Sequence, residues 1–502
     1  MYRRTMIGQQ KLDIPFGVEL NTDNRWVKLA AILPWEKIEK CYAKNFTSEK
    51  GEVAKPGRLA FAALYIQNRL AIVDTEVVEQ IRETPSMQYF CGFDCYTTEK
   101  PFDSSLMVHF RKRITPEMMK EISEEAFMAE ARKTIERTKD DNNDNESNEE
   151  SKRKDANDAN GESNGEGKPK GTLLLDATCC PSDIHYPTDI YLLNHARELL
   201  ELIIDILHVQ LAYLGVTKPR TYREIARGVY LRYAKKRKHT HGEIRFTIRQ
   251  QLQYVRRNLD SIAKQVELGA KLGELPTGLY RKLLVISELY RQQKQMYDEK
   301  THSVEDRIVS IEQPHLRPIV RGKEHNSVEF GAKVTIGLVG GFSFVVRMDY
   351  DNFSEAKYLK AAAEEYKRIF GFYPKVIIGD KAYTTNENRN YCKTKGIRLS
   401  GPKRGRKTEQ VKEAERKQLY QEGCERNAIE GHLGNGKRKY GLALIMTKLW
   451  DTTLTAISFG FFVTNMERIL RLFSLLNFIT MEIVGFFLLW PSLLFWSVST
   501  VQ

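Results

Sequence analysis

The sequence has little cysteine, and its cysteines form no pattern. There are seven, an odd number, scattered along the chain without the spacing of a disulfide framework. Free thiols of this kind are typical of a reducing compartment. The opening stretch MYRRTMIGQQKLDIPFGVEL also lacks an apolar run after its basic residues, so we expect no secretory signal. The two absences together favour a protein of the cytoplasm.

Acidic residues are fewer than basic ones. The chain has 65 Asp and Glu against 78 Lys and Arg, which gives a formal net charge of +13. A positive field of this size favours a polyanionic partner, either nucleic acid or an anionic membrane. The length of 502 residues, 41% of them hydrophobic, is enough for two or three folded units.

Residues 1–137 are expected to form an all-helical N-terminal domain that binds DNA. Apolar residues recur there at three- and four-residue spacing, as in RLAFAALYIQNRLAI. The stretch PFDSSLMVHFRKRI predicts one helix of this domain, with Asp103 as its N-cap. This helix ends in Arg111, Lys112 and Arg113. These three side chains either contact DNA or form the solvated end of a core helix.

Residues 138–170 contain almost no apolar side chain and many Asn, Asp, Glu, Ser and Gly. A segment of this composition cannot bury a core of its own. It therefore predicts a disordered linker that separates the helical domain from the next unit.

Residues 171–450 show both strand and helix patterns. GTLLLDATCC and KVIIGD are short apolar runs typical of buried strands, and VEFGAKVTIGLVGGFSFVVRMDY predicts an antiparallel hairpin turning at Gly340 and Gly341. Residues at about 192–300 instead predict long helices, which form a large helical insertion. The order predicts an α/β domain with a mixed sheet and helices packed on it.

Asp176 and Asp380 each follow one of these apolar runs. Each is expected at the end of a strand, and sites in open α/β sheets gather beyond the carboxyl ends of strands. On neighbouring strands the two acids could share Mg²⁺, which prefers carboxylate oxygens. Two such ions can stabilise the attacking and the leaving oxygen of a phosphoryl displacement. The alternative is that each aspartate only caps a turn or a helix.

A third acid lies in CERNAIEGHLGNGKRKYGL. Arg426, Glu430 and Lys437 follow one another at offsets of four and seven residues, which places them on one face of a helix. Glu430 could then reach the metals while the two cations hold phosphates. The alternative is a solvated helix with a weak Arg426–Glu430 pair. Gly434 and Gly436 count against a regular helix that continues to Lys437.

Two further stretches are basic. KPRTYREIARGVYLRYAKKRKHTHGEIRFTIRQ interleaves basic residues with tyrosines, as in a nucleic-acid groove or, alternatively, on a solvated helical face. A later loop contains Lys403, Arg404 and Arg406, and we interpret it as a similar candidate for phosphate contacts.

The three acidic motifs resemble those of the DDE transposases of bacterial insertion sequences, in the group related to insertion sequence five. GTLLLDATCCPSDIHYPTD is similar to the segment of the first aspartate, and KVIIGDKAYTTNENRNYCKTKGI to that of the second. RNAIEGHLGNGKRKYGL matches the signature in which Arg, Glu and Lys recur at fixed spacing. The resemblance covers most of the chain. One departure is Gly423, where relatives often carry a tyrosine; here Tyr420 lies one turn earlier.

The resemblance implies a ribonuclease-H-like core in which Asp176, Asp380 and Glu430 bind two Mg²⁺ ions, with Mn²⁺ as a substitute. It implies double-stranded DNA as the partner, both terminal inverted repeats and target DNA, bound by a homodimer or a higher oligomer. Water would cleave the 3′ ends, and the freed 3′-hydroxyls would attack target DNA. Arg426 and Lys437 would contact DNA, and the protein would act at the nucleoid. A catalytically inactive DNA-binding derivative and another ribonuclease-H-like nuclease are the alternatives.

Residues 451–502 are expected to form an apolar helical tail. After Glu482 the chain has no charge, over a length that approaches a membrane span. Pro491 and the polar residues near the end argue against a span. A buried or oligomer-forming tail is the alternative, and no membrane partner is expected.

Overall fold

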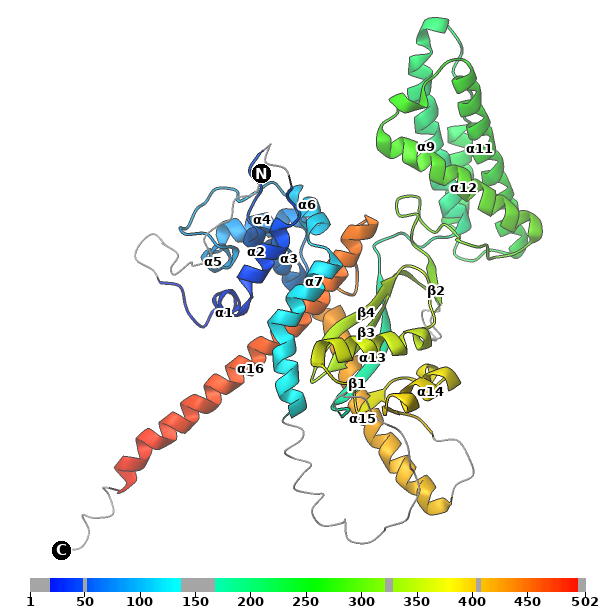
Figure 1. Cartoon of the computed structure of the whole chain (residues 1–502). Coiled ribbons are helices and arrows are strands. Elements are labelled where there is room, and N and C mark those ends of the chain that lie inside the picture. Colours follow the sequence, from blue (N-terminus) through cyan, green and yellow to red (C-terminus); the bar gives the residue numbers. More distant parts are fainter. Residues whose placement is uncertain (1–18, 48–51, 137–167, 321–327, 403–407, 495–502) are drawn as a thin grey trace, which may run out of the picture.

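The computed structural model describes residues 19–47, 52–136, 168–320, 328–402 and 408–494, with side chains up to residue 473 (Figure 1). Figure 1 shows a group of N-terminal helices beside an α/β core, and a helical bundle that stands off from both. Most of the predicted linker, residues 138–167, lies outside the described residues.

Short helices make up the N-terminal region. They are α1 (Arg25–Ile32), α2 (Trp35–Ala43), α3 (Gly57–Leu70), α4 (Asp74–Glu83), α5 (Pro85–Cys91), α6 (Leu106–Arg113), α7 (Pro116–Ser123) and the π-helical turn η2 (Glu124–Met128). Thr115 caps α7 by accepting the N–H of Met118 at 3.4 Å. The predicted N-cap of α6 is wrong by two residues. Ser105 occupies that position, and Asp103 instead accepts the Ser105 N–H at 3.0 Å.

The α/β core contains the predicted mixed sheet. Its strands are β1 (Thr172–Pro181), β2 (Pro318–Val320), β3 (Val328–Val339), β4 (Phe342–Asp349), β5 (Val376–Ile378) and β6 (Arg398–Leu399). Their order is β2-β3-β1-β5-β6, with β4 also paired to β3. β1 is antiparallel to β3 and parallel to β5. The hairpin turns where predicted, at Gly340 and Gly341, whose φ angles of 58° and 83° suit glycine.

Helices cover both faces of this sheet. They are η5 (Glu355–Tyr358), α13 (Leu359–Phe370), η6 (Lys381–Tyr383), α14 (Asn386–Thr394), α15 (Glu409–Lys439) and α16 (Trp450–Leu494). Side chains alternate along β1, so Leu173 packs into the cluster that contains Leu359 of α13. Leu174 points to the other face and shares a cluster with Ile429 of α15. The arrangement is consistent with the ribonuclease-H-like fold that the motifs predicted.

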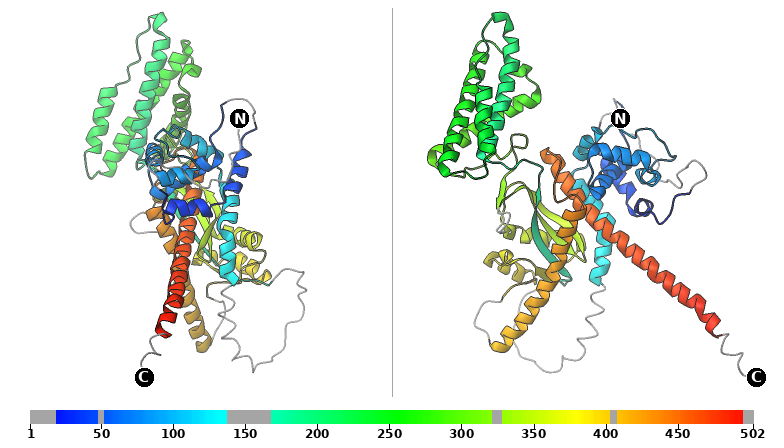
Figure 2. Two further views of the ribbon diagram at one scale, coloured as in Figure 1. Left: turned by 90° about the vertical axis from the view of Figure 1, so that its left-hand side faces the viewer. Right: turned by 180° about the vertical axis from the view of Figure 1, so that it is seen from behind.

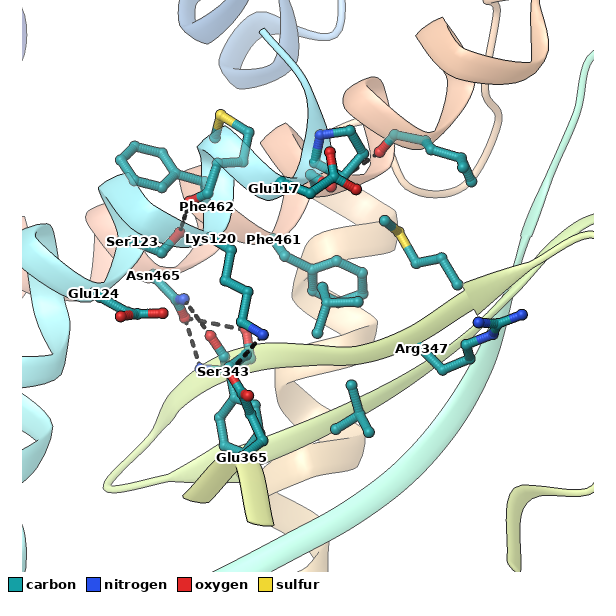
Figure 3. A pocket seen from close by; sticks show the side chains of 18 of the residues that line it. Glu117, Lys120, Ser123, Glu124, Ser343, Arg347, Glu365, Phe461, Phe462 and Asn465 are labelled. Atoms are coloured by element: carbon teal, nitrogen blue, oxygen red, sulfur yellow. Dashed lines mark hydrogen bonds and ion pairs between the residues drawn. The ribbon is translucent and has the colours of Figure 1, made fainter. Parts of the chain in front are cut away.

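The N-terminal helices and one face of the sheet share a single hydrophobic core. Phe459 of α16 lies 5.0 Å from the ring of Phe61 in α3, and Phe127 of η2 stacks on Phe342 of β4 at 6.0 Å. Figure 3 shows the polar contacts at the same junction, around a cavity of about 430 Å³. There Asn465 of α16 accepts the N–H of Ser343 in β4 at 2.9 Å. The first part of the predicted C-terminal tail is therefore a core element.

The helical insertion connects β1 to β2 and has a core of its own. It contains α9 (Asp189–Gln210), η3 (Ala212–Leu214), α10 (Arg223–Ala234), α11 (His241–Glu267), η4 (Leu272–Glu274) and α12 (Thr277–Glu299). In Figures 1 and 2 the insertion rises on one side of the sheet, while α16 runs out of the core in the opposite direction.

Within the described part of the chain, no helix combines the length and the apolar character that crossing a membrane requires. The predicted uncharged segment after Glu482 continues α16 to Leu494 as helical backbone. Its last eight residues, 495–502, lie outside the described residues.

Candidate active site

Asp176 and Asp380 come from adjacent parallel strands. Leu174 of β1 pairs with Ile378 of β5, and each aspartate lies two residues further along its chain segment. Because parallel strands keep their register, the two carboxylates start from neighbouring positions at the carboxyl end of β5. The prediction that both acids end a strand is wrong for Asp176. β1 continues to Pro181, so this acid lies in the middle of its strand.

Glu430 comes from α15, which packs against β1. Asp176 points to the same face of the sheet as Leu174, because both lie at alternate positions of β1. That face is covered by Ile429 and Leu433 of α15, and Glu430 adjoins this buried contact with a side chain that is 55% exposed. The third acid therefore approaches the two aspartates from the helix that covers their sheet face.

Two polar contacts hold α15 in this position. Glu422, one turn before the signature arginine, is buried and accepts hydrogen bonds from Arg398 and Ser400 at the end of β6. On another side of the helix, Nε2 of His432 lies 2.8 Å from the hydroxyl of Ser343 in β4. These contacts fix the rotation of α15, and with it the direction of the Glu430 side chain.

Arg426 links two of the acids, Glu430 and Asp380. Its NH2 group lies 3.2 Å from a carboxylate oxygen of Glu430, and its NH1 group lies 3.6 Å from one of Asp380. Its Nε is buried and has no hydrogen-bond partner among the described residues. The predicted Arg426–Glu430 pair is thus present, but the guanidinium also reaches the second aspartate.

Asp176 is half-buried at this point, and its environment disfavours its negative charge. Burial raises the pKa of the Asp176 carboxyl, and the carboxylates of Glu355 and Glu430 raise it further. The Ala177 N–H and the Arg426 guanidinium act in the opposite direction. A carboxylate in such surroundings gains from any cation that is brought next to it.

The donor set suits a hard divalent cation, because carboxylate oxygens are the ligands that Mg²⁺ and Mn²⁺ prefer. Two carboxylates pair with the Arg426 guanidinium, and its charge also lowers the pKa of the Asp176 carboxyl, so positive charge is favoured between the acids. They are not drawn together as direct ligands: the described residues contain no group of three or more Asp, Glu, His or Cys side chains close enough to hold a metal ion. Metal entry would require the acids to move closer and Arg426 to move away.

Two residues next to the acids were missed by the sequence analysis. Glu355, at the start of η5, pairs with Lys333 of β3 at 3.1 Å. Tyr383, in η6, has a buried hydroxyl without a hydrogen-bond partner among the described residues. Burial raises the pKa of the Tyr383 hydroxyl, as do the carboxylates of Glu355, Asp176 and Asp380. The tyrosine therefore stays protonated beside the acids and is available as a donor.

Lys437 lies on α15 beyond the acids. The helix continues without interruption to Lys439, so the expectation that Gly434 and Gly436 interrupt it is wrong. The physical reason is packing. A Cβ at Gly436 would lie 2.8 Å from Leu442, so glycine permits a close approach there. Lys437 is half-buried and forms no ion pair with another described residue.

The predicted basic cluster of α6 is divided between core and surface. Arg111 is only 5% exposed and is bound to Asp74 of α4 and Gln67 of α3. Its positive charge is neutralised by Asp74 within the N-terminal helices, which contradicts the predicted DNA contact for this residue. Lys112 is exposed, and Arg113 lies over the ring of Phe46 at 4.7 Å.

Two other predictions concern the basic residues before α15 and the tyrosine in the first half of α15. Lys403, Arg404 and Arg406 lie outside the described residues. Gly423 faces open space, with no atom within 4 Å of a Cβ built there, and Tyr420 is 75% exposed. The helix thus presents the Tyr420 ring to solvent one turn before the site where relatives often carry a tyrosine.

Comparisons with known proteins point to one kind of protein. Residues 17–113 match a family described as Transposase domain (DUF772), and residues 377–467 match one described as Transposase DDE domain. A protein of Rhizobium meliloti, described as uncharacterized protein ORF8 in nfe locus, is 34% identical over 103 residues. That match covers 20% of this chain and 49% of the relative, so the chain spans about half the relative's length. No solved structure matches the chain.

Proposed function

We propose that the chain is a DDE transposase of an insertion sequence, which cuts the ends of a mobile DNA element and joins them to target DNA, because residues 17–113 and 377–467 are similar to transposase domains. The observation that supports the proposal is that Arg426 of α15 pairs with both Glu430 and Asp380, while Arg426 and Glu430 are near enough to Asp176 of β1 to shift its pKa. The second match contains Asp380, Arg426, Glu430 and Lys437. Asp176 lies outside the matched residues and is assigned from the strand register.

In the proposed site, Asp176, Asp380 and Glu430 hold two divalent cations, Mg²⁺ or Mn²⁺. When bound, these ions supply Lewis-acid stabilisation for an in-line displacement at phosphorus. With cations held by the acids, Arg426 would no longer be needed to neutralise Glu430 and Asp380. Its guanidinium would then be free for a charge-assisted contact with a DNA phosphate, and Lys437 would bind another further along α15.

The proposed substrates are the terminal inverted repeats of the element and then target DNA, both double-stranded. Water is the nucleophile when the 3′ ends are cleaved, and the freed 3′-hydroxyl is the nucleophile when the ends are joined. Both displacements use the same acids. Since both ends of the element must be cut and joined together, we propose a homodimer or a higher oligomer on DNA. It would act at the nucleoid in the cytoplasm.

The N-terminal helices are proposed to bind DNA through surface cations. Lys112 is exposed at the end of α6 and is suited to phosphate contacts, whereas Arg111 is committed to its ion pair. Since these helices share a core with the sheet, DNA bound to them is held at a fixed position relative to the acids. The residues of the loop before α15, Lys403, Arg404 and Arg406, are proposed as further phosphate contacts.

Cleavage of DNA that carries the element's own ends tests the proposal. Purified protein with Mg²⁺ should nick each 3′ end. Asp176→Asn should abolish nicking and leave DNA affinity unchanged, because the carboxylate is needed for metal and not for DNA. Asp183→Asn is the matched control, since this exposed aspartate follows β1 outside the acid cluster. Cleavage by the Asp176 variant at the wild-type rate would refute the site, and binding without any cleavage by the wild type would favour the inactive derivative.

A further inference from the structure

The helical insertion concentrates positive charge in one segment. Residues 227–249 contain eight lysines and arginines and a single acid, Glu243. The net charge of this segment is thus more than half of the +13 of the whole chain. Four of the cations are consecutive at residues 235–238, called here the basic loop, which joins α10 to α11. All four are exposed.

The basic loop has a defined shape. Tyr233 and His239, on either side of it, stack at 3.7 Å with an interplanar angle of 12°. Thr240 begins α11 with a reciprocal capping box, in which its hydroxyl accepts the Glu243 N–H and the Glu243 carboxylate accepts the Thr240 N–H. Lys236 pairs with the same glutamate. The loop is therefore closed at its base, and its geometry is set before any partner binds.

The other three cations of the basic loop are not neutralised. Lys235, Arg237 and Lys238 form no ion pair with any residue that the structure describes. Three exposed cations elsewhere in the insertion differ in this respect, because Lys271, Arg291 and Lys294 pair with Glu274, Glu288 and Asp298. A cluster of unpaired like charges costs electrostatic energy, which a polyanion would offset.

The basic loop lies at the end of the insertion that joins the sheet. His241 at the start of α11, Asp189 at the start of α9 and Lys300 after α12 line one cavity. The carboxylate of Asp189 also raises the pKa of Tyr233, after burial as the main cause, which places the end of α10 at the same point. The start of α9 is the point at which the chain arrives from β1. Figures 1 and 2 show this end of the bundle turned toward the sheet.

The same end of the sheet carries the acids. β1 runs past Asp176 to Pro181 and then enters the insertion, and it is parallel to β5, whose carboxyl end leads to Asp380. The 13 residues from Asp176 to the start of α9 can span at most about 45 Å. One turn of a DNA duplex is about 34 Å long. A duplex that lies across the acids therefore passes the base of the insertion within roughly one and a half turns.

From this placement we propose that the basic loop binds the phosphate backbone of the same DNA duplex that lies across Asp176, Asp380 and Glu430. The inference rests on the proposed function for its substrate and adds a second contact region within about one and a half turns of the reacting phosphate. Lys235, Arg237 and Lys238 make the contacts. They read no base sequence, because consecutive cations in a short loop recognise charge.

The test is the salt dependence of DNA binding by the full chain. The probe is a fluorescent duplex about three turns long, of arbitrary sequence, measured without divalent metal so that no cleavage occurs. Replacing Lys235, Arg237 and Lys238 by Gln should reduce the slope of log K against log salt by about 2 to 3, because each lost phosphate contact removes about 0.9. Replacing Lys271, Arg291 and Lys294 by Gln is the control with equal charge, and it should leave the slope unchanged. Thermal unfolding verifies that both variants are folded.

A slope in the basic-loop variant equal to that of the wild type overturns the inference and leaves the proposed cleavage activity standing. Competition by polyglutamate as strong as that by unlabelled duplex also overturns it, because the loop would then be a general polyanion site. If the slope falls as expected but Mg²⁺ supports no cleavage of the element's ends, the basic loop is supported and the proposed function alone fails.

Discussion

Replacing Arg426 by Gln tests whether this guanidinium neutralises the carboxylates that a metal ion would otherwise bind. Its two NH groups lie 3.2 Å from Glu430 and 3.6 Å from Asp380, and the two carboxylate side chains are 55% and 50% exposed. Ion pairs as exposed as these are worth about 0.2–1 kcal/mol each. Together they oppose metal entry by about 0.4–2 kcal/mol, which corresponds to a factor of roughly 2–30 in affinity.

Isothermal titration of Mn²⁺ into the DNA-free protein measures this factor. The Arg426→Gln variant should bind Mn²⁺ more tightly than the wild type, and it should cleave DNA more slowly, because its phosphate contact is lost. Arg416→Gln is the matched control, since Arg416 is exposed on the same helix well before the acids. Mn²⁺ affinity that is unchanged or weaker in the Arg426 variant, with the control equal to the wild type, refutes the reasoning.

Three further changes test the site and the helices around it. Cleavage should decline as the pH falls through the raised pKa of Asp176, and Glu355→Gln should move this decline to lower pH, because Glu355 raises that pKa; a pH–rate profile measures both. Gly436→Ala should lower the free energy of unfolding in urea by about 1–3 kcal/mol, because its methyl group would lie 2.8 Å from a buried leucine, whereas Gly423→Ala in open space should raise it by about 0.5–1 kcal/mol. Arg111→Ala should lower it by about 1–3 kcal/mol, because a buried ion pair is broken, and should leave the DNA affinity of the folded protein unchanged.

The sequence predicted the sheet from apolar runs, but it misplaced the end of β1. A charged residue inside a buried strand is unusual, so Asp176 looked like the end of the apolar run. The residues that follow, Ala177 to Cys180, are small or sulfur-containing, and they continue the strand as buried positions. The charge is tolerated because β5 pairs with β1 only as far as Leu174, so Asp176 is paired with Ile336 of β3 but lies beyond the end of β5 on its other side.

Glu355 and Tyr383 could not be predicted from spacing. Each lies in a short 3₁₀ helix, η5 or η6, without a periodic pattern. Their position beside Asp176 arises only when the two short helices meet at the end of β5. By contrast, Arg426 and Glu430 were found because an offset of four residues is a property of one helix, whatever it packs against.

The burial of Arg111 could have been predicted from the spacing of the apolar residues in α6. In α6 the buried side chains are Met107, Phe110 and Arg111, and Ile114 follows directly after the helix. Their spacing of three and four residues puts Arg111 on the apolar face. Three consecutive basic residues suggested a single surface, yet consecutive positions on a helix point in directions about 100° apart.

The most direct test of the central claim is iron-mediated cleavage of the protein chain itself. Fe²⁺ bound in place of Mg²⁺, with ascorbate and peroxide, generates radicals that cut the backbone next to the ion, and mass spectrometry locates the cuts. The account predicts cuts near Asp176, Asp380 and Glu430 together, suppressed by excess Mg²⁺ and absent in Asp380→Asn. Cuts that cluster at only one of these segments, or that persist in the variant, would contradict a shared metal site.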